Sequence, residues 1–289
     1  MFDGLIESLQ EWLLTTLKSF TSWSLDLVHS LFQNSVKSVR ENVSETPEGF
    51  SPYIVDNLRL ISDTAILPVA GLILTYIFCY EIYELVVEKN RGNDFETGQL
   101  MFLIFKTAAA ILLITNSFDI TLAFFDVGKW ITDKVPEEAL IIPDPVTAIL
   151  VDSVDNIGVA LGYSVLGVIV LIVTFLMAGI IYLVAWSRII IILLYVSVAP
   201  IPFATLMNRE WIGSIGQNYI KQLIALMLQG FFMMICLVIY AGLLEKTTRM
   251  MDNAEQPIFA LLLLLVSMGI LTITLTRTHS LAKSVVGVV

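Results

Sequence analysis

Two long stretches without a charged residue dominate this chain. No Asp, Glu, Lys or Arg occurs in residues 156–187, and after Arg188 none occurs from Ile189 to Asn208. A helix of about 20 apolar residues is enough to cross the hydrocarbon core of a bilayer. Hydrophobic residues make up 57% of the 289 positions and charged residues 15%, against about 45–50% and about 25% in soluble domains. The chain is therefore predicted to be a multi-pass membrane protein.

The apolar segments predict an all-α polytopic fold with about six transmembrane helices and an N-terminal amphipathic helix. We expect a turn between the third and fourth spans near Trp186, Ser187 and Arg188, because an aromatic residue and a base suit a membrane interface. One long tilted or broken helix through both segments is the alternative. The expected spans are residues 64–87, 100–125, 157–183, 189–206, 217–244 and 257–276.

The second expected span is interrupted by charge. Lys106 and Asp119 leave only residues 107–118 free of charged side chains. Each of the two side chains must either reach a headgroup region or find a partner inside the helix bundle. We expect them to reach opposite headgroup regions.

The net charge of −10 comes from two acidic segments. Residues 1–63 hold nine acids and four bases, and residues 126–155 hold seven acids and two bases, so each contributes −5. Such a balance excludes a nucleic-acid surface that depends on a large basic excess. The expected organisation is an N-terminal helix and linker, two spans, an acidic loop, a C-terminal bundle and a tail: residues 1–63, 64–125, 126–156, 157–276 and 277–289.

The first 31 residues are predicted to form an amphipathic helix, because their apolar residues recur at spacings of three and four. Charged residues every few positions prevent this helix from crossing hydrocarbon. We expect it in the headgroup region or against a neighbouring subunit, with Trp12 and Trp23 as interfacial anchors on a docking face. Packing on the core of its own chain is the alternative.

Residues that could carry out catalysis do not form any familiar motif. The sequence has no HExxH, GxSxG, Walker A or dinucleotide-binding glycine pattern. His29 and His279 lie at opposite ends of the chain, and Cys79 and Cys236 lie in apolar segments without a CxxC partner. We therefore predict no catalytic, cofactor-binding or metal-binding residues and a non-enzymatic role.

Pro200 and Pro202 predict a helix break at membrane depth. Both lack a backbone donor and block continuation of an ordinary helix. Freed carbonyls are tolerated within a membrane only where protein or a water-filled cavity satisfies them. The break is either a pore-lining element or the end of a helix at the interface followed by an in-plane segment, and the sequence leaves both open.

Three carboxamides are predicted to share one face of the fifth span. Asn218, Gln222 and Gln229 recur at steps of three and four residues. In a bilayer, such side chains hydrogen-bond across helices or line an aqueous passage, and inter-helix contact is the commoner fate. Gly158 and Gly162 form a small-xxx-small pattern, with Gly167 and Gly179 further along, which by default indicates close helix packing.

The same region carries a resemblance to a known family. The segments Arg188–Ala204, Asn208–Trp211, Asn218–Leu223 and Leu228–Phe232 resemble TrbL-like polytopic subunits of conjugative type IV secretion systems, in versions similar to those of Gram-positive conjugative elements. In that family a helix ends at an APxxxA-like turn, a Trp-containing hinge follows, and a Gln-bearing helix comes next. The matching positions here are Ala199, Pro200, Ala204, Trp211, Gln222 and Gln229.

The resemblance implies a non-enzymatic platform or channel subunit in the cell membrane. It implies a homo-oligomer, expected to be a ring, that acts with the ATPases and other subunits of the secretion system. DNA–protein complexes would pass it on the way to a recipient cell, and the central loop would face outward. Trp211 and Arg188 are expected to be interfacial anchors.

Two other function classes remain open from the residues alone. A stand-alone solute transporter would need an intramembrane ion pair or broken helices in two matching halves, and the sequence offers one visible break. A passive pore-forming protein usually needs less length and no long acidic loop.

Overall fold

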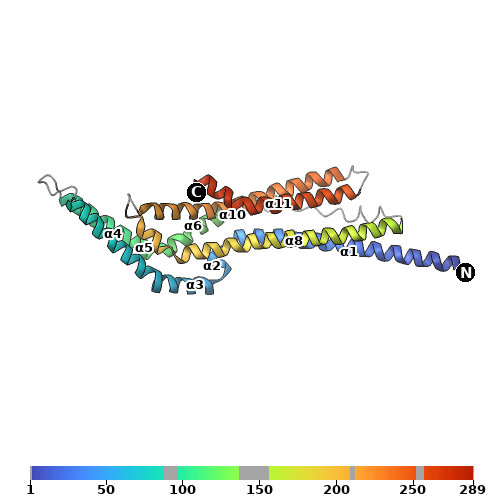
Figure 1. Cartoon of the computed structure of the whole chain (residues 1–289), viewed down its shortest axis with the longest axis horizontal. Coiled ribbons are helices and arrows are strands. Elements are labelled where there is room, and N and C mark those ends of the chain that lie inside the picture. Colours follow the sequence, from blue (N-terminus) through green and yellow to red (C-terminus); the bar gives the residue numbers. More distant parts are fainter. Residues whose placement is uncertain (1, 88–96, 137–155, 209–211, 252–256, 289) are drawn as a thin grey trace. The chain divides into compact units, whose positions relative to one another are not determined.

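The computed structural model describes residues 2–87, 97–136, 156–208, 212–251 and 257–288, where all regular structure is helical (Figure 1). The all-α fold is therefore confirmed. The described elements are α1 (Phe2–Ser44), α2 (Pro47–Phe50), α3 (Pro52–Ile61), the π-helical turn η1 (Ser62–Ile66), α4 (Leu67–Val87), α5 (Thr97–Thr115), α6 (Ser117–Thr132), α8 (Ile157–Ser197), α9 (Pro200–Thr205), α10 (Gly213–Met251) and α11 (Pro257–Val286).

Five of these helical segments are long and apolar enough to cross a bilayer, among the residues that the structure describes. Helix α1 is not one of them, in agreement with its charged face. The difference from the expected six arises in α8, where one helix replaces two spans. The five candidate spans are Pro52–Val87, Gly98–Thr115, Ile157–Ser197, Gly213–Lys246 and Leu262–Val286.

The prediction of a turn near Trp186–Arg188 is wrong. Helix α8 runs without interruption through these residues (Figure 1). The physical reason is local: no Gly or Pro lies between Gly179 and Pro200, and an open turn at membrane depth would leave backbone groups without partners. The 41-residue helix is about 60 Å long, roughly twice the hydrocarbon thickness.

The second span is shorter than expected. Helix α5 ends at Thr115, and Asn116 adopts a non-helical conformation before α6 begins at Ser117. The Asn116 side-chain amide donates to the Leu112 carbonyl at 2.8 Å, which is the local competition with helical hydrogen bonding that Asn commonly makes. Asp119 therefore lies in α6, outside the candidate span.

The described chain divides into two compact units, each with its own apolar core. Unit 1 contains residues 1–43, 134–186 and 232–278, and unit 2 contains residues 44–133, 187–231 and 279–289. Because α8, α10 and α11 are continuous helices, each contributes one part of its length to each unit.

Unit 1 is a bundle of α1 with parts of α8, α10 and α11. From Thr21 onward α1 buries a stripe of residues in this bundle, so the alternative of packing on its own core holds for that part of the helix. Phe32 of α1 lies against Tyr240 of α10, with ring centroids 5.4 Å apart. The buried stripe consists of Thr21, Ser24, Leu25, Val28, Phe32, Ser35, Val36, Val39, Asn42 and Val43.

Small polar residues bring α1 close to α8 in unit 1. The hydroxyls of Thr21 and Ser164 are 2.9 Å apart, and a Cβ on Gly167 would lie 2.6 Å from the Ser24 Oγ. A Cβ on Gly158, Gly162 or Gly179 would meet nothing within 4 Å. Within one chain, Gly158 and Gly162 therefore do not make the close helix contact that we expected. Gly167 makes such a contact instead.

Unit 2 is arranged around the short helix α9. Helix α9 packs between α4 and α5, and it also touches α6 and η1. Its residues Pro200, Pro202, Phe203, Ala204 and Thr205 are buried. The break in the chain after α8 is therefore covered by protein on several sides.

Replacing Gly167 by Val should weaken the packing of α1 on α8, whereas the same change at Gly162 should be nearly neutral. A side chain at residue 167 collides with Ser24, and overpacking of this kind costs about 1–3 kcal/mol of unfolding free energy. Thermal unfolding of both variants in the same mild detergent measures the difference. Equal unfolding temperatures would contradict the observed α1–α8 contact.

Candidate functional site

The two prolines shape the start of α9, and the two carbonyls that lose their proline-side donors find other ones. In a regular helix the missing amides of Pro200 and Pro202 would donate to the carbonyls of Val196 and Val198. The amide of Ala199 donates to the Val196 carbonyl at 3.3 Å, and the amide of Ile201 donates to the Val198 carbonyl at 3.2 Å. These tighter i-to-i+3 bonds let the break lie inside unit 2.

Two glycines allow α10 to start directly against α9. A Cβ on Gly213 would lie 1.7 Å from the Asn208 carbonyl oxygen, and a Cβ on Gly216 would lie 2.6 Å from the Pro202 carbonyl oxygen. No side chain fits at either distance without movement of the backbone. The chain therefore makes a close hairpin from α9 into α10, with the prolines on one arm and the glycines on the other.

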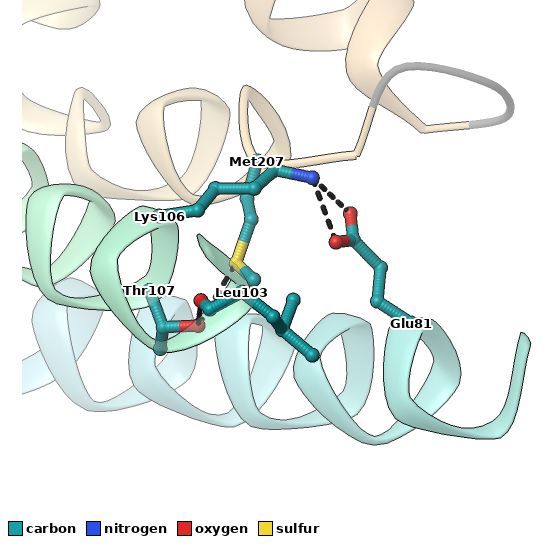
Figure 2. Close-up of polar contacts among 5 residues, drawn as sticks. All are labelled: Glu81, Leu103, Lys106, Thr107 and Met207. Atoms are coloured by element: carbon teal, nitrogen blue, oxygen red, sulfur yellow. Dashed lines mark hydrogen bonds and ion pairs between the residues drawn. The ribbon is translucent and has the colours of Figure 1, made fainter. Parts of the chain in front are cut away.

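An ion pair joins α4 and α5 beside this hairpin. Lys106 Nζ lies 2.6 Å and 2.7 Å from the two carboxylate oxygens of Glu81, and both side chains are mostly buried, at 27% and 14% exposure. Figure 2 shows the Lys106 side chain extended toward Glu81. On the next residue, the Thr107 hydroxyl donates to the Leu103 carbonyl and lies 3.9 Å from the Met207 sulfur. The pair therefore lies close to the end of the α9 hairpin.

A second ion pair joins α3 and α6 in unit 2. Arg59 donates to the Asp119 carboxylate at 2.5 Å, and its guanidinium lies 4.7 Å from the centre of the Phe118 ring. Lys106 and Asp119 thus both have partners within the protein. Lys106 lies near the middle of the Gly98–Thr115 span and finds its partner on the neighbouring helix instead of reaching towards a headgroup region. Asp119 lies outside that span, and its place in a headgroup region stays a prediction.

The three carboxamides of α10 lie in different surroundings. Asn218 is exposed, Gln222 is half-buried and Gln229 is buried. Gln229 Oε1 lies 3.1 Å from Nδ1 of His279, so it joins α10 to the end of α11. The Oε1 atom of Gln222 is buried and has no hydrogen-bond partner among the described residues. The roles of Asn218 and Gln222 stay predictions.

The residues predicted as interfacial anchors also lie in different surroundings. Trp12 and Trp23 are exposed on α1, and Trp211 lies outside the described residues. Arg188 is buried in unit 2, where its Nη2 atom lies 2.6 Å from the position of a Cβ on Gly230. A glycine at residue 230 therefore makes room for the guanidinium. The anchoring role of all four residues stays a prediction.

Several contacts of this site were beyond the reach of the sequence patterns. The Tyr219 hydroxyl donates to the Tyr195 carbonyl at 2.8 Å and lies 3.5 Å from the Thr121 hydroxyl, which ties α10 to α8 and α6. A tyrosine in an apolar segment is too common to signal this. The lone lysine at residue 106 did signal the need for a partner, but not that the partner is Glu81.

The described residues contain no group of three or more His, Cys, Asp or Glu side chains that could hold a metal ion. Cys79 is exposed and Cys236 is half-buried. What the site offers is structural: a buried helix break, a tight hairpin and two charge pairs that hold neighbouring helices together.

Comparison with known families decides what kind of protein carries this arrangement. The model of a family described as "TrbL/VirB6 plasmid conjugal transfer like protein" matches residues 32–200, which is more than half of the 289 residues. The chain belongs to the TrbL/VirB6 conjugal-transfer family. Comparisons with curated proteins and with solved structures find no match.

Membership in the TrbL/VirB6 family makes the chain a multi-pass membrane subunit of a conjugal-transfer, type IV secretion apparatus. This family consists of structural secretion-system subunits and not of enzymes. The match ends at Pro200, so it includes α8 and the first residue of α9. The hinge and the Gln-bearing part of α10, on which the sequence resemblance also rested, lie beyond it.

Replacing Lys106 by Met should destabilise this TrbL/VirB6 family member by about 3 kcal/mol of unfolding free energy, because it leaves the Glu81 carboxylate buried without its partner. Adding Glu81→Gln to the same chain should recover most of the loss. The exposed Lys37–Glu41 pair on α1 is the matched control, where Lys37→Met should cost less than about 1 kcal/mol. Unfolding in detergent followed by circular dichroism measures all three, and equal losses for both lysines would contradict the buried pair.

Proposed function

We propose that the protein is an inner-membrane platform or channel subunit through which a conjugative secretion system moves DNA–protein complexes to a recipient cell. The family match over residues 32–200 carries the proposal. The proposed partners are further copies of the chain in a ring, the ATPases and other subunits of the apparatus, and the lipid bilayer. The transferred complex is a partner only in transit.

The helix break fits a subunit that holds its shape within a bilayer. The carbonyls at Val196 and Val198 are bonded within the chain, and α9 is covered by α4 and α5. An assembly that a large cargo passes needs rigid helices that do not depend on lipid for hydrogen bonds. We propose that Pro200 and Pro202 serve this purpose.

We also propose an orientation for the chain. Five crossings leave the two termini on opposite sides of the membrane. With the central loop on the outer side, as the family resemblance implies, the N-terminal helix is outside and the C-terminal tail is in the cytoplasm. This arrangement places Arg277 and Lys283 in the cytoplasmic half of the Leu262–Val286 span, towards the end where basic residues are favoured.

A single cysteine placed in residues 135–150, in a chain whose Cys79 and Cys236 are replaced by Ser, tests this orientation. A membrane-impermeant maleimide added to intact cells should label it to completion, and a cysteine placed in the tail after residue 284 should react only after the cells are broken. The opposite pattern would reverse the proposed orientation.

Replacing both Gln222 and Gln229 by Leu should lower the frequency of DNA transfer without preventing membrane insertion. The change removes the Gln229 contact with His279 and the buried carboxamide of Gln222. Each inter-helix hydrogen bond of this kind contributes about 0.6–2 kcal/mol. Mating frequency from a deletion strain carrying the variant measures the effect, alongside the amount of protein in the membrane fraction.

The exposed Gln217 of the same helix supplies the matched control, and Gln217→Leu should transfer DNA at the normal frequency. Unchanged transfer by the double variant would remove both glutamines from the functional set.

One observation favours a second candidate function. A stand-alone transporter would need an intramembrane ion pair, and Lys106–Glu81 is such a pair. The described helices offer one proline-broken segment, however, rather than two in matching halves. Purification in mild detergent followed by imaging separates the two: a closed ring supports the secretion subunit, and a monomer that moves a solute in vesicles supports the transporter.

A further inference from the structure

The N-terminal half of α1 presents an apolar stripe that no other part of the described chain covers. No residue from 6 to 20 is buried, although this part of the helix carries large apolar side chains. Trp12 is 65% exposed and Trp23 is 56% exposed. The exposed members of the stripe are Ile6, Leu9, Trp12, Leu13, Phe20 and Trp23.

The stripe is separate from the face by which α1 packs in unit 1. The buried residues Thr21, Ser24 and Val28 directly follow the stripe residues Phe20, Trp23 and Leu27 in the sequence. One residue corresponds to a rotation of about 100° around an α-helix. Folding of unit 1 therefore buries the face beside the stripe and leaves Phe20 and Trp23 exposed.

The spacing of the stripe is that of a coiled coil. Ile6, Leu13, Phe20 and Leu27 recur every seven residues, and Leu9, Thr16 and Trp23 recur every seven residues between them. This is a repeat of 3.5 residues over three heptads, about 33 Å of helix. Thr16 is the one polar member, and its hydroxyl donates to the Trp12 carbonyl of its own helix at 2.8 Å. The Thr16 hydroxyl therefore needs no hydrogen-bond acceptor on a partner helix.

The charges beside the stripe decide between its possible occupants. From Gln10 to Leu27 the positions that flank a coiled-coil seam are Gln10, Trp12, Leu17, Ser19, Ser24 and Asp26. Asp26 is the one charged residue among them, and across a parallel seam it faces Leu31 of the other copy. Glu7 and Glu11 lie away from the seam. Identical helices can therefore meet along the stripe without like charges facing each other. An anionic lipid surface would instead attract Lys and Arg, of which residues 1–27 contain one.

We propose that residues 6–27 of α1 form a parallel coiled coil with the same segment of a second copy of this chain. The proposal rests on the proposed homo-oligomeric platform and names the surface by which its copies meet. Copies in one membrane share one orientation, so their α1 helices run in the same direction and equal positions face each other. Unit 1 buries the neighbouring face of α1 from Thr21 onward, so between residues 21 and 27 the coil and the bundle use adjacent faces of one helix.

Cysteine cross-linking in native membranes tests the proposal in the full-length chain. With Cys79 and Cys236 replaced by Ser, Leu9→Cys and Leu13→Cys each place a thiol on the seam, and Glu11→Cys places one on the opposite side of the same helix. After mild oxidation the seam variants should yield about tenfold more disulfide-linked dimer than E11C, because a disulfide needs Cβ atoms about 4 Å apart.

Two versions of the chain with different tags, expressed together, identify the partner. Dimers that carry both tags support the proposal. Equal cross-linking at all three positions, no dimer from the seam, or linkage to a different protein would overturn it. Circular dichroism of each variant before oxidation establishes that it is folded. The cross-linking readout does not depend on DNA transfer. If no coil forms, the conjugal role is still tested by the mating assay. If DNA transfer fails, the cross-linking result still tests the coil.

Discussion

Hydrogen bonding around Pro200 and Pro202 is the constraint on which the arrangement of unit 2 depends. Lipid offers no donors, so the carbonyls of Val196 and Val198 must find partners inside the protein. The amides of Ala199 and Ile201 supply them at 3.3 Å and 3.2 Å. Helix α9 can then lie between α4 and α5 as a buried element. The glycines at 213 and 216 complete the hairpin by letting α10 approach without a side chain in between.

The need to find partners inside the protein also explains the charged pairs. A lysine near the middle of an apolar helix has its charge desolvated, and a carboxylate on the adjacent helix offsets this cost. Lys106 meets Glu81 between α4 and α5, and Arg59 meets Asp119 between α3 and α6. Both pairs join segments that come before α8 in the chain. Together with the α9 contacts they connect the first candidate spans of a conjugal-transfer subunit into one unit.

The two halves of α1 illustrate how one helix can serve two surfaces. From Thr21 to Val43 its buried stripe packs with α8, α10 and α11. Before Thr21 the apolar residues Ile6, Leu9, Trp12, Leu13 and Phe20 remain exposed. A shift of a single residue, about 100° on the helix, separates the bundle face from the face that we assign to a second copy.

The sequence by itself determined the all-helical membrane character, the absence of a span in α1, and the positions where proline forbids a regular helix, because hydropathy, periodicity and backbone chemistry act locally. Only the tertiary structure decided that α8 continues through Trp186 and Arg188, that Lys106 pairs with Glu81, and that Gly167 rather than Gly162 touches α1. Each of these depends on which side chain of a distant segment lies within a few ångströms. The spacing of residues within one helix gives no information about the distance to a side chain on another segment.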